Sequence, residues 1–454
     1  MEPYKKHRVI LTALNANLVN VAFGTCLGWS SPIVPKLNTH TEDSPLKFPI
    51  TKEEEGWITS IITLGSLSTC IIGGPLGGLI GRKWTLLVGS MFFTASFILM
   101  MVATEVWFIY LGRLMQGFGA GLCVATLPLY VGEIATDDVR GALGSLMALN
   151  LLGGILYVYC IGPYVSYIAL QWFCIAIPIL FLVIFPFMPE SPYFYAARNQ
   201  RPEGIKSLQF LRGQKASQVE AEMTKVQKNV DEAKSRKGKL TDVICNRGYR
   251  KALFICCGLL TLQQLTGTSV VTFNSQSIFS SAKSTLDPAI ATIILGVVQL
   301  FSNLITPFVV DRSGRKIVLL ISACGMCVSL VALGTFFYIQ AFGDATGIEW
   351  LPVPALIAFN VLYSFGFGPL PWAVLGEIFP LNIKPIGTSI ACVCAFITGF
   401  VVTRWFPELN ALGPYYAFWI FGSLCIVALL FVIFVMFETK GLSLQQIEEK
   451  LHAK

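Results

Sequence analysis

The sequence predicts an all-α membrane protein with twelve transmembrane helices in two pseudo-symmetric six-helix bundles. Three observations support this fold class: an apolar composition, twelve apolar stretches of membrane-spanning length, and a set of charged motifs that occurs twice in the same order. Of the 454 residues, 54% are hydrophobic and only 13% are charged, which is about half the charged fraction of a soluble domain. The composition therefore excludes a water-soluble globular protein.

Twelve stretches are apolar and long enough to cross a bilayer, which takes roughly 20 residues. We number them as spans 1 to 12 and place them at about 9–30, 55–80, 84–103, 107–131, 142–163, 167–188, 252–280, 288–310, 317–341, 352–376, 386–406 and 414–437. A long polar segment separates the sixth span from the seventh. We therefore expect a first bundle at 1–195, a linker at 196–250, and a second bundle with a short tail at 251–454.

Charged motifs mark the ends of the spans and occur once in each half. The first-half set is Arg82, Glu133, Arg140 and Glu190, and the second-half set is Asp311, Arg315, Glu377, Lys384 and Glu438. Charges are costly inside a bilayer and collect at helix ends, so the repetition indicates two copies of one six-helix unit. Many solute carriers use such a duplicated bundle to expose one central site alternately to each side.

Basic residues are distributed unevenly over the loops. Residues 196–251 contain fourteen Lys/Arg and six Asp/Glu, whereas Glu42, Asp43 and residues 53–55 make the loop after span 1 acidic. Because basic loops stay on the cytoplasmic side, we expect both termini and the linker to be cytoplasmic. The net charge of +7 therefore indicates membrane topology rather than a nucleic-acid partner, and we expect a multi-pass protein of the cell membrane, in contact with lipid.

Part of the linker has the pattern of an amphipathic helix. Val219, Met223, Val226 and Val230 recur at spacings of four, three and four residues, which places them on one helix face. We expect short helices packed on the cytoplasmic face of the bundles. A helix that binds the membrane surface or a partner is the alternative.

Polar residues and helix breakers interrupt two spans. Span 7 contains a Gln-Gln-Leu-Thr-Gly sequence at 263–267, and span 10 contains a stretch rich in Gly and Pro at 366–372. Such breaks are tolerated where protein or a cavity satisfies the freed backbone groups.

The thirteen cysteines show no metal-site spacing, and His7, His40 and His452 lie outside the predicted spans. We therefore expect no metal, no cofactor and no enzyme active site.

Seven motifs follow one another along nearly the whole chain. They are Gly112-Arg113, Pro128 to Gly141, Pro189 to Pro192, Gln263 to Gly267, Asp311 to Lys316, Gly368 to Pro380, and Glu438 to Gly441. Together they closely resemble the sugar-porter branch of the major facilitator superfamily. Within that branch the chain is similar to the insect facilitated trehalose transporters, at Ser364 to Pro369 and in the stretch from Gly296 to Arg312. The resemblance implies the major facilitator fold and sugar transport by alternating access.

Several positions depart from the pattern of that branch. Gly78 replaces the usual acid, Ala148 replaces a Gln, Ser269 replaces an Asn, Phe273 and Asn274 replace two Tyr, Ser364 replaces the Glu of hexose carriers, and Ala395-Phe396 replace Asn-Trp. The charged motifs are retained while several sugar contacts are lost. The resemblance therefore implies the transport class but leaves the identity of the sugar open.

Polar side chains near the middle of the membrane are the candidate sugar contacts. They are Gln263, Gln264, Gln299, Trp372, Asn150 and Ser269. The resemblance implies the Gln pair, Gln299 and Trp372 by position, whereas polarity and depth suggest Asn150. Amides suit a sugar because each offers two donors and an acceptor, and an aromatic face can cover the C–H patches of the ring. An interhelical hydrogen bond is the alternative role for each Gln.

The resemblance also implies a role for the charged motifs as a cytoplasmic gate. In that role they form a salt-bridge network that holds the two halves together while the cavity faces outward, and so stabilise one of two states. Simple anchoring of helix ends is the alternative. Arg113, at the outer end of span 4, is expected to be structural or part of an outer gate.

Three functions agree with these features. The first is a facilitative sugar carrier, for trehalose or a hexose, functional as a monomer. The second is a proton-coupled sugar or polyol symporter, and the third is a non-transporting nutrient sensor. Span 1 has no acid where proton-coupled members of the family carry an Asp, between Gly24 and Trp29, and span 10 has Ser364 in place of Glu. These two positions favour the facilitative carrier, because coupling needs a group in the pathway that can change its protonation.

Overall fold

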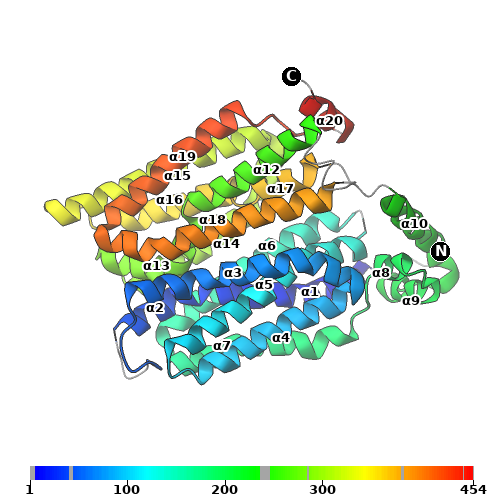
Figure 1. Cartoon of the computed structure of the whole chain (residues 1–454), viewed down its shortest axis with the longest axis horizontal. Coiled ribbons are helices and arrows are strands. Elements are labelled where there is room, and N and C mark those ends of the chain that lie inside the picture. The colour runs from blue at the N-terminus through cyan, green and yellow to red at the C-terminus, as the bar shows by residue number, and fades with distance from the viewer. Residues whose placement is uncertain are drawn as a thin grey trace.

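The computed structural model describes residues 6–39, 44–136, 138–235, 246–283, 286–379, 383–442 and 444–452. The described residues are nearly all helical, and they include twelve segments long and apolar enough to cross a membrane. The twelve predicted spans and the all-α class are therefore confirmed. Figure 1 shows two bundles of helices, with α8–α10 and both ends of the chain on one side. We call this side the linker side and the opposite one the far side.

The first bundle contains spans 1 to 6. Its helices are α1 (Lys6–Gly28), α2 (Ser30–Asn38), α3 (Lys52–Leu79), α4 (Arg82–Met101), α5 (Val106–Ile134), α6 (Arg140–Ile161) and α7 (Tyr167–Ile184). Span 1 is longer than predicted, because Trp29 keeps helical dihedrals and the chain continues as α2. The polar Ser30-Ser31 pair ended the apolar pattern in the sequence, but both residues are buried. His7 lies in the exposed first turn of α1 rather than before it.

The second bundle contains spans 7 to 12. Its helices are α12 (Arg247–Leu265), α13 (Thr268–Ala282), α14 (Pro288–Ser313), α15 (Arg315–Phe342), α16 (Pro352–Phe365), α17 (Leu370–Ile378), α18 (Lys384–Leu412) and α19 (Pro414–Phe434), followed by α20 (Leu444–His452). Spans 7 and 10 are each broken in two, as their glycines and prolines predict. At the first break Gly267 has φ +82°, a left-handed conformation that favours glycine.

The linker forms a small helical layer of its own. Its described helices are α8 (Pro192–Ala197), α9 (Arg201–Arg212) and α10 (Ala216–Ser235), so this layer begins four residues before the predicted linker start at 196. Val219, Met223 and Val226 of α10 are buried in a cluster with Ala196 and Leu208, so the apolar face seen in the sequence packs against α8 and α9. The side chain of Arg212 is nearly buried, and its guanidinium joins Glu222 at 2.6 Å to the carbonyl of Ile134 at 3.0 Å. This arginine therefore fixes the layer to the end of α5.

Glycines let helices of the first bundle approach backbone to backbone. A Cβ on Gly24 of α1 would lie 2.1 Å from the carbonyl oxygen of Leu151 on α6, and one on Gly117 of α5 would lie 2.3 Å from that of Ile62 on α3. Close approach through small residues is a main source of helix association in lipid. These glycines therefore set the spacing between α1 and α6 and between α3 and α5.

The two bundles are joined on the far side. Helix α3 packs along α18, α6 along α14, and α2 along α13. Tyr159 Oη donates to the carbonyl of Thr272 at 2.6 Å, and the amide of Gln276 donates to Ser31 Oγ at 3.2 Å. Toward the linker side, a Cβ on Gly74, Gly78, Gly144 or Gly376 would meet nothing within 4 Å. The halves therefore pack together on the far side, whereas these linker-side glycines have no neighbour from the other half.

Candidate functional site

The break in span 7 places Gln263 against the break in span 10. Its Nε2 donates to the carbonyls of Phe367 at 2.5 Å and Gly368 at 2.8 Å. Those carbonyls lie between α16 and α17, where no regular helix bond is available. Gln263 is almost fully buried, and its Oε1 has no hydrogen-bond partner among the described residues. One end of this amide therefore stabilises a helix break, and the other is an unused acceptor.

Gln264 and Ser269 form a second polar contact across the same joint. Ser269 Oγ donates to Gln264 Oε1 at 2.8 Å, which leaves the amide nitrogen of Gln264 as a donor for another group. Helix α18 packs closely against the side chain of Gln264, since a Cβ on Gly399 would lie 3.3 Å from Gln264 Oε1. The structure thus brings together three of the six predicted sugar contacts, Gln263, Gln264 and Ser269, at the α12–α13 joint.

The other three candidates lie on other helices. Gln299 is buried on α14, and Trp372 on α17 is 38% exposed. Asn150 on α6 donates to the carbonyl of Leu146 in its own helix at 2.8 Å. The hydrogen bonds found among the described residues do not join these three side chains to the Gln pair. Their part in a sugar site stays a prediction.

A fully buried arginine lies in the first bundle, in contact with neutral groups. Arg113 donates to the carbonyls of Cys26 at 2.5 Å and Ile58 at 3.0 Å, and to the side chains of Gln116 at 2.7 Å and Ser30 at 3.0 Å. Its guanidinium also lies 5.4 Å from the centre of the Trp29 ring. A buried charge is costly unless it is hydrogen-bonded. Here carbonyl, amide and hydroxyl oxygens satisfy it, and none of the bonds found for Arg113 goes to a carboxylate.

The charged motif of the first half forms a closed cluster on the linker side. The carboxylate of Glu133 pairs with Arg82 at 3.0 Å and also accepts from Ser191 Oγ. Glu190 accepts from the backbone N–H groups of Arg82 at 3.1 Å, Lys83 at 3.0 Å and Ser191 at 2.8 Å. Because Glu190 lies at the N-terminus of α4, the helix dipole favours its charge. Burial is the stronger effect, and it raises the pKa of Glu190 above that of an ordinary glutamate.

The second half repeats this cluster with equivalent residues. Glu377 pairs with Arg315 at 3.1 Å and accepts from Thr439 Oγ1 at 2.8 Å. Glu438 accepts from the backbone N–H groups of Arg315 at 3.0 Å, Lys316 at 3.0 Å and Lys440 at 2.9 Å. Partial burial acts to raise the pKa of Glu438, but these backbone donors outweigh it and hold the pKa below the ordinary value.

The remaining motif residues lie near these two clusters. Lys384 begins α18 and donates to the carbonyl of Gly376 at 2.6 Å, and Arg140 begins α6. The side chain of Asp311 lies outside the described residues. Among the described residues, every hydrogen bond found for the side chains of Arg82, Glu133, Glu190, Arg315, Glu377 and Glu438 stays within its own half. In this state the two clusters do not bridge the halves.

A charged contact on the far side lies outside the set of predicted site residues. Arg404 of α18 pairs with Glu53 of α3 at 3.4 Å, and so with a residue of the other half. The signal was present in the sequence, because Arg404 falls inside predicted span 11 and an ionisable residue inside a span is a functional candidate by default.

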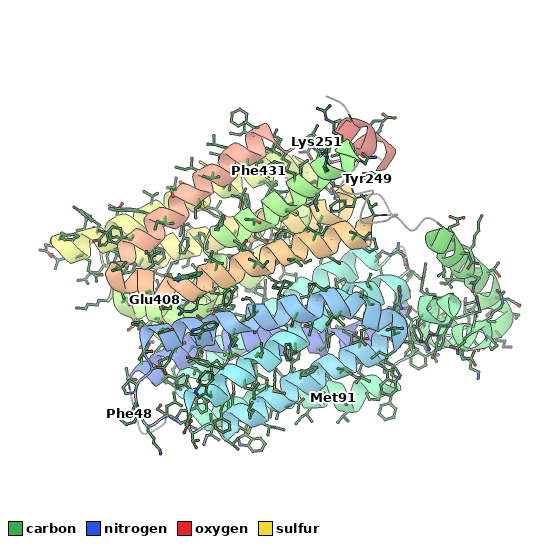
Figure 2. The ribbon with its side chains drawn as sticks, in the orientation of Figure 1. Phe48, Met91, Tyr249, Lys251, Glu408 and Phe431 are labelled. Atoms are coloured by element: carbon green, nitrogen blue, oxygen red, sulfur yellow. The ribbon has the colours of Figure 1, made fainter. Side chains whose placement is uncertain are left out.

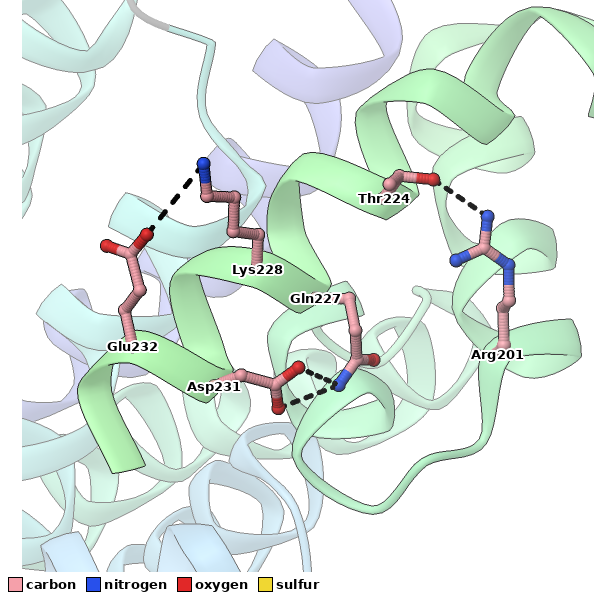
Figure 3. A pocket seen from close by; sticks show the side chains of 6 residues that line it. All are labelled: Arg201, Thr224, Gln227, Lys228, Asp231 and Glu232. Atoms are coloured by element: carbon pink, nitrogen blue, oxygen red, sulfur yellow. Dashed lines mark hydrogen bonds and ion pairs between the residues drawn. The ribbon is translucent and has the colours of Figure 1, made fainter. Parts of the chain in front are cut away.

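A surface hollow on the linker helices is separate from these groups. Figure 3 shows its lining side chains on and beside α10: Arg201, Thr224, Gln227, Lys228, Asp231 and Glu232. They contact one another, since Lys228 lies 4.0 Å from Glu232, Gln227 donates to Asp231 at 3.2 Å, and Arg201 donates to Thr224 at 2.9 Å. The hollow contains none of the predicted sugar contacts.

Comparison of the sequence with known proteins assigns the chain to a protein family. The family described as "Sugar (and other) transporter" matches residues 20–451. The chain belongs to this sugar transporter family. It is 38% identical over 446 residues to the facilitated trehalose transporter Tret1 of Anopheles gambiae, with 97% of the chain and 56% of the relative covered. It is 36% identical over 451 residues to the Tret1 of Apis mellifera ligustica, with 99% and 89% covered. The transporter thus spans little more than half of the mosquito protein.

Solved structures support the same fold for this sugar transporter family member. The inward-open conformation of the xylose transporter XylE from E. coli matches with a TM-score of 0.81 and 23% identity, covering 97% of this chain and 99% of that one. The structure of the proton:xylose symporter XylE bound to 6-bromo-6-deoxy-D-glucose matches with a TM-score of 0.75 and 25% identity, covering 99% of this chain and 100% of that one. The predicted major facilitator fold is therefore confirmed.

Proposed function

We propose that this protein is a facilitative carrier, which moves a sugar across the membrane by alternating access and is driven only by the gradient of that sugar. Membership of the sugar transporter family supports the substrate class. Trehalose is the first candidate, because the two insect relatives described above are named facilitated trehalose transporters. A hexose is the second.

The proposed sugar site centres on the joint between α12 and α13. Gln263 Oε1 is a buried acceptor in need of a donor, and Gln264 has a free amide donor beside Ser269. Together they match the donor and acceptor character of a sugar hydroxyl. Gln299, Asn150 and Trp372 complete the proposed site from α14, α6 and α17. The partly exposed ring of Trp372 is suited to cover an apolar face of the sugar.

The neutral groups around Arg113 support the proposal that transport is not coupled to protons. Proton coupling needs a carboxylate or another group that gains and loses a proton during the cycle. The bonds found for Arg113 all go to carbonyl, amide or hydroxyl oxygens. The acidic residues inside the twelve spans, Glu53 to Glu55, Glu133, Glu377 and Glu408, all lie within a few residues of a span end. A proton-coupled symporter is the alternative, and the 25% identity to a solved proton:xylose symporter keeps it as the rival.

We infer the orientation and the gate from the charge distribution. The linker side is cytoplasmic, in agreement with the basic linker, so the structure corresponds to an inward-facing carrier of the cell membrane that works as a monomer. The two charged clusters on this side act as the cytoplasmic gate. They are closed within their own halves while the cavity faces inward, and they exchange contacts between the halves when it faces outward.

Uptake into proteoliposomes tests both the substrate and the coupling. Radiolabelled trehalose, glucose, fructose and a polyol are offered with and without an inward proton gradient. We expect at least one sugar to enter and to stop at equal concentrations under both conditions. Accumulation above the outside concentration, abolished by a protonophore, would establish the symporter instead. Specific binding of a sugar without any uptake would favour a sensor.

A further inference from the structure

A charged contact joins the two halves on the far side of the molecule. Helices α3 and α18 run antiparallel there, with the rings of Trp57 and Phe400 5.9 Å apart and Thr59 Oγ1 3.5 Å from the carbonyl of Thr403. A Cβ on Gly56 would lie 2.4 Å from the carbonyl oxygen of Arg404. The glycine therefore allows a backbone approach that a side chain would prevent, and this brings Arg404 directly onto the first half.

Arg404 contacts groups of both halves at once. Its guanidinium pairs with Glu408 one turn further along α18 and lies 3.4 Å from Glu53 of α3. It also lies 5.1 Å from the centre of the Trp57 ring. The side chain is only 12% exposed. Figure 2 shows Glu408 at the end of α18 that points away from α8–α10, so this contact lies at the entrance that is closed here.

An arginine suits this position because its planar group can stack on a ring and pair with carboxylates at the same time. Glu408 belongs to the same helix as Arg404 and moves with it. Glu53 and Trp57 belong to the other half. An opening of the far side separates α3 from α18, and so it breaks the contacts with Glu53 and Trp57 while the one with Glu408 is retained. The contacts therefore stabilise one state of the carrier and not the other.

We propose that Arg404, Glu53 and Trp57 form a far-side latch, which favours the state that is open toward the linker side. The latch rests on the proposed alternating-access function, in which the far side must open to admit or release the sugar. It acts on the ratio of the two states and touches none of the predicted sugar contacts. Loss of the stacking and the ion pair together should shift that ratio roughly tenfold toward far-side opening.

Hydrogen exchange of the sugar-free protein in nanodiscs tests the latch. In Arg404→Gln we expect backbone exchange to rise roughly tenfold at the far-side ends of α3 and α18, and to fall at their linker-side ends. Arg404→Lys should give an intermediate increase, because it keeps the charge but loses the stacking. Lys52→Gln is the matched control. It removes an ion pair of 2.9 Å with Glu55 that lies within α3 alone, and should leave exchange of α18 as in the wild type.

If Arg404→Gln does not fold, a variant with a smaller expected effect, Glu53→Gln, can be used in the same hydrogen-exchange measurement. Glu53 is largely exposed, and Glu53→Gln should raise far-side exchange in the same direction by a few-fold. Unchanged hydrogen exchange in Arg404→Gln would overturn the latch. If Arg404→Gln does not fold, unchanged exchange in Glu53→Gln would do the same. An increase in exchange that is spread evenly over the far side and the linker side would also overturn it. The readout needs no sugar. A shift of exchange in a protein that transports none of the sugars offered would therefore support the latch and refute the proposed function.

Discussion

The two charged clusters on the linker side have the same geometry but different surroundings. In each half a Glu pairs with the Arg at the start of a helix, and a second Glu accepts from the backbone N–H groups of that helix end. Glu190 of the first half is buried under the linker layer, where Ser207 Oγ of α9 donates to its carbonyl at 2.6 Å. Glu438 of the second half is only half-buried. Duplication therefore preserved the contacts, whereas the linker made one copy more enclosed than the other.

This asymmetry indicates different roles for the two copies. The first-half cluster is tied to α8, α9 and the start of α4, so it is part of the fixed structure of its bundle. In the second-half cluster the paired glutamate is more exposed, 31% for Glu377 against 16% for Glu133, and it lies on α17, which follows the break in span 10. We therefore expect the second copy to change its contacts more readily during the transport cycle. The following predictions test this difference, from the largest expected effect to the smallest.

Neutralising the paired glutamates should affect stability unequally. Glu133 accepts from two nitrogens of its arginine, Nε and Nη2 of Arg82, each at 3.0 Å, whereas Glu377 accepts from one nitrogen of its arginine, Nη2 of Arg315, at 3.1 Å. Two-point pairs are stronger and more directional. We expect Glu133→Gln to lower the free energy of unfolding by about 3 kcal/mol and Glu377→Gln by about 1 kcal/mol. Thermal unfolding in detergent measures both, and equal losses would contradict the assigned asymmetry.

Gln264→Ala should weaken sugar binding without disturbing either cluster. The variant removes one hydrogen-bonding side chain from the proposed site, which costs about 2 kcal/mol, or roughly a thirtyfold loss of affinity. Equilibrium binding and uptake at matched protein levels measure it. Asn150→Ala is the comparison, because that amide already bonds within its own helix and should cost less. Unchanged uptake kinetics in Gln264→Ala would remove this residue from the site.

The gate prediction concerns the balance between the two states. If the clusters join the halves when the cavity faces the far side, Glu377→Gln or Arg140→Gln should favour the state open toward the linker side and slow turnover. The expected shift is about 1 kcal/mol, as for a partly exposed ion pair. Hydrogen exchange on the two sides reports it, and should move opposite to Arg404→Gln. No change in the ratio would support the role of these residues as anchors of helix ends.

Titration should separate Glu190 from Glu438. The pKa of Glu190 is raised and that of Glu438 is lowered, so as pH falls Glu190 takes up its proton above the ordinary glutamate value near 4.3 and Glu438 only below it. The charged Glu438 stabilises the folded protein at pH values above the ordinary glutamate pKa, and this stabilisation is lost as the pH falls through the lowered pKa of Glu438. For Glu190 the sign is opposite, because its pKa is raised in the folded protein: its contribution to the free energy of unfolding increases as the pH falls and the carboxyl becomes protonated. Infrared difference spectra of Glu190→Gln and Glu438→Gln would show the order, and the reverse order would refute it.

The sequence determined the twelve spans, the two broken helices and the duplicated charged motifs. Apolar length, glycine or proline at a break, and charge at a span end are local properties, and each is visible in a short stretch of chain. The family resemblance added the positions of Gln263 and Gln264. It did not indicate that Gln263 holds the backbone of Phe367 and Gly368, about a hundred residues away.

The tertiary structure decided the contacts between distant helices. Only packing shows that Arg113 has neutral partners from α1, α2, α3 and its own helix, or that Arg404 reaches Glu53 and Trp57 across the two halves. The approach of α3 and α18 depends on Gly56 meeting a backbone carbonyl from the other bundle. The identity of a residue fixes which bonds it can form. Which partner it meets depends on how the helices pack, because helix periodicity specifies a face but not its neighbour.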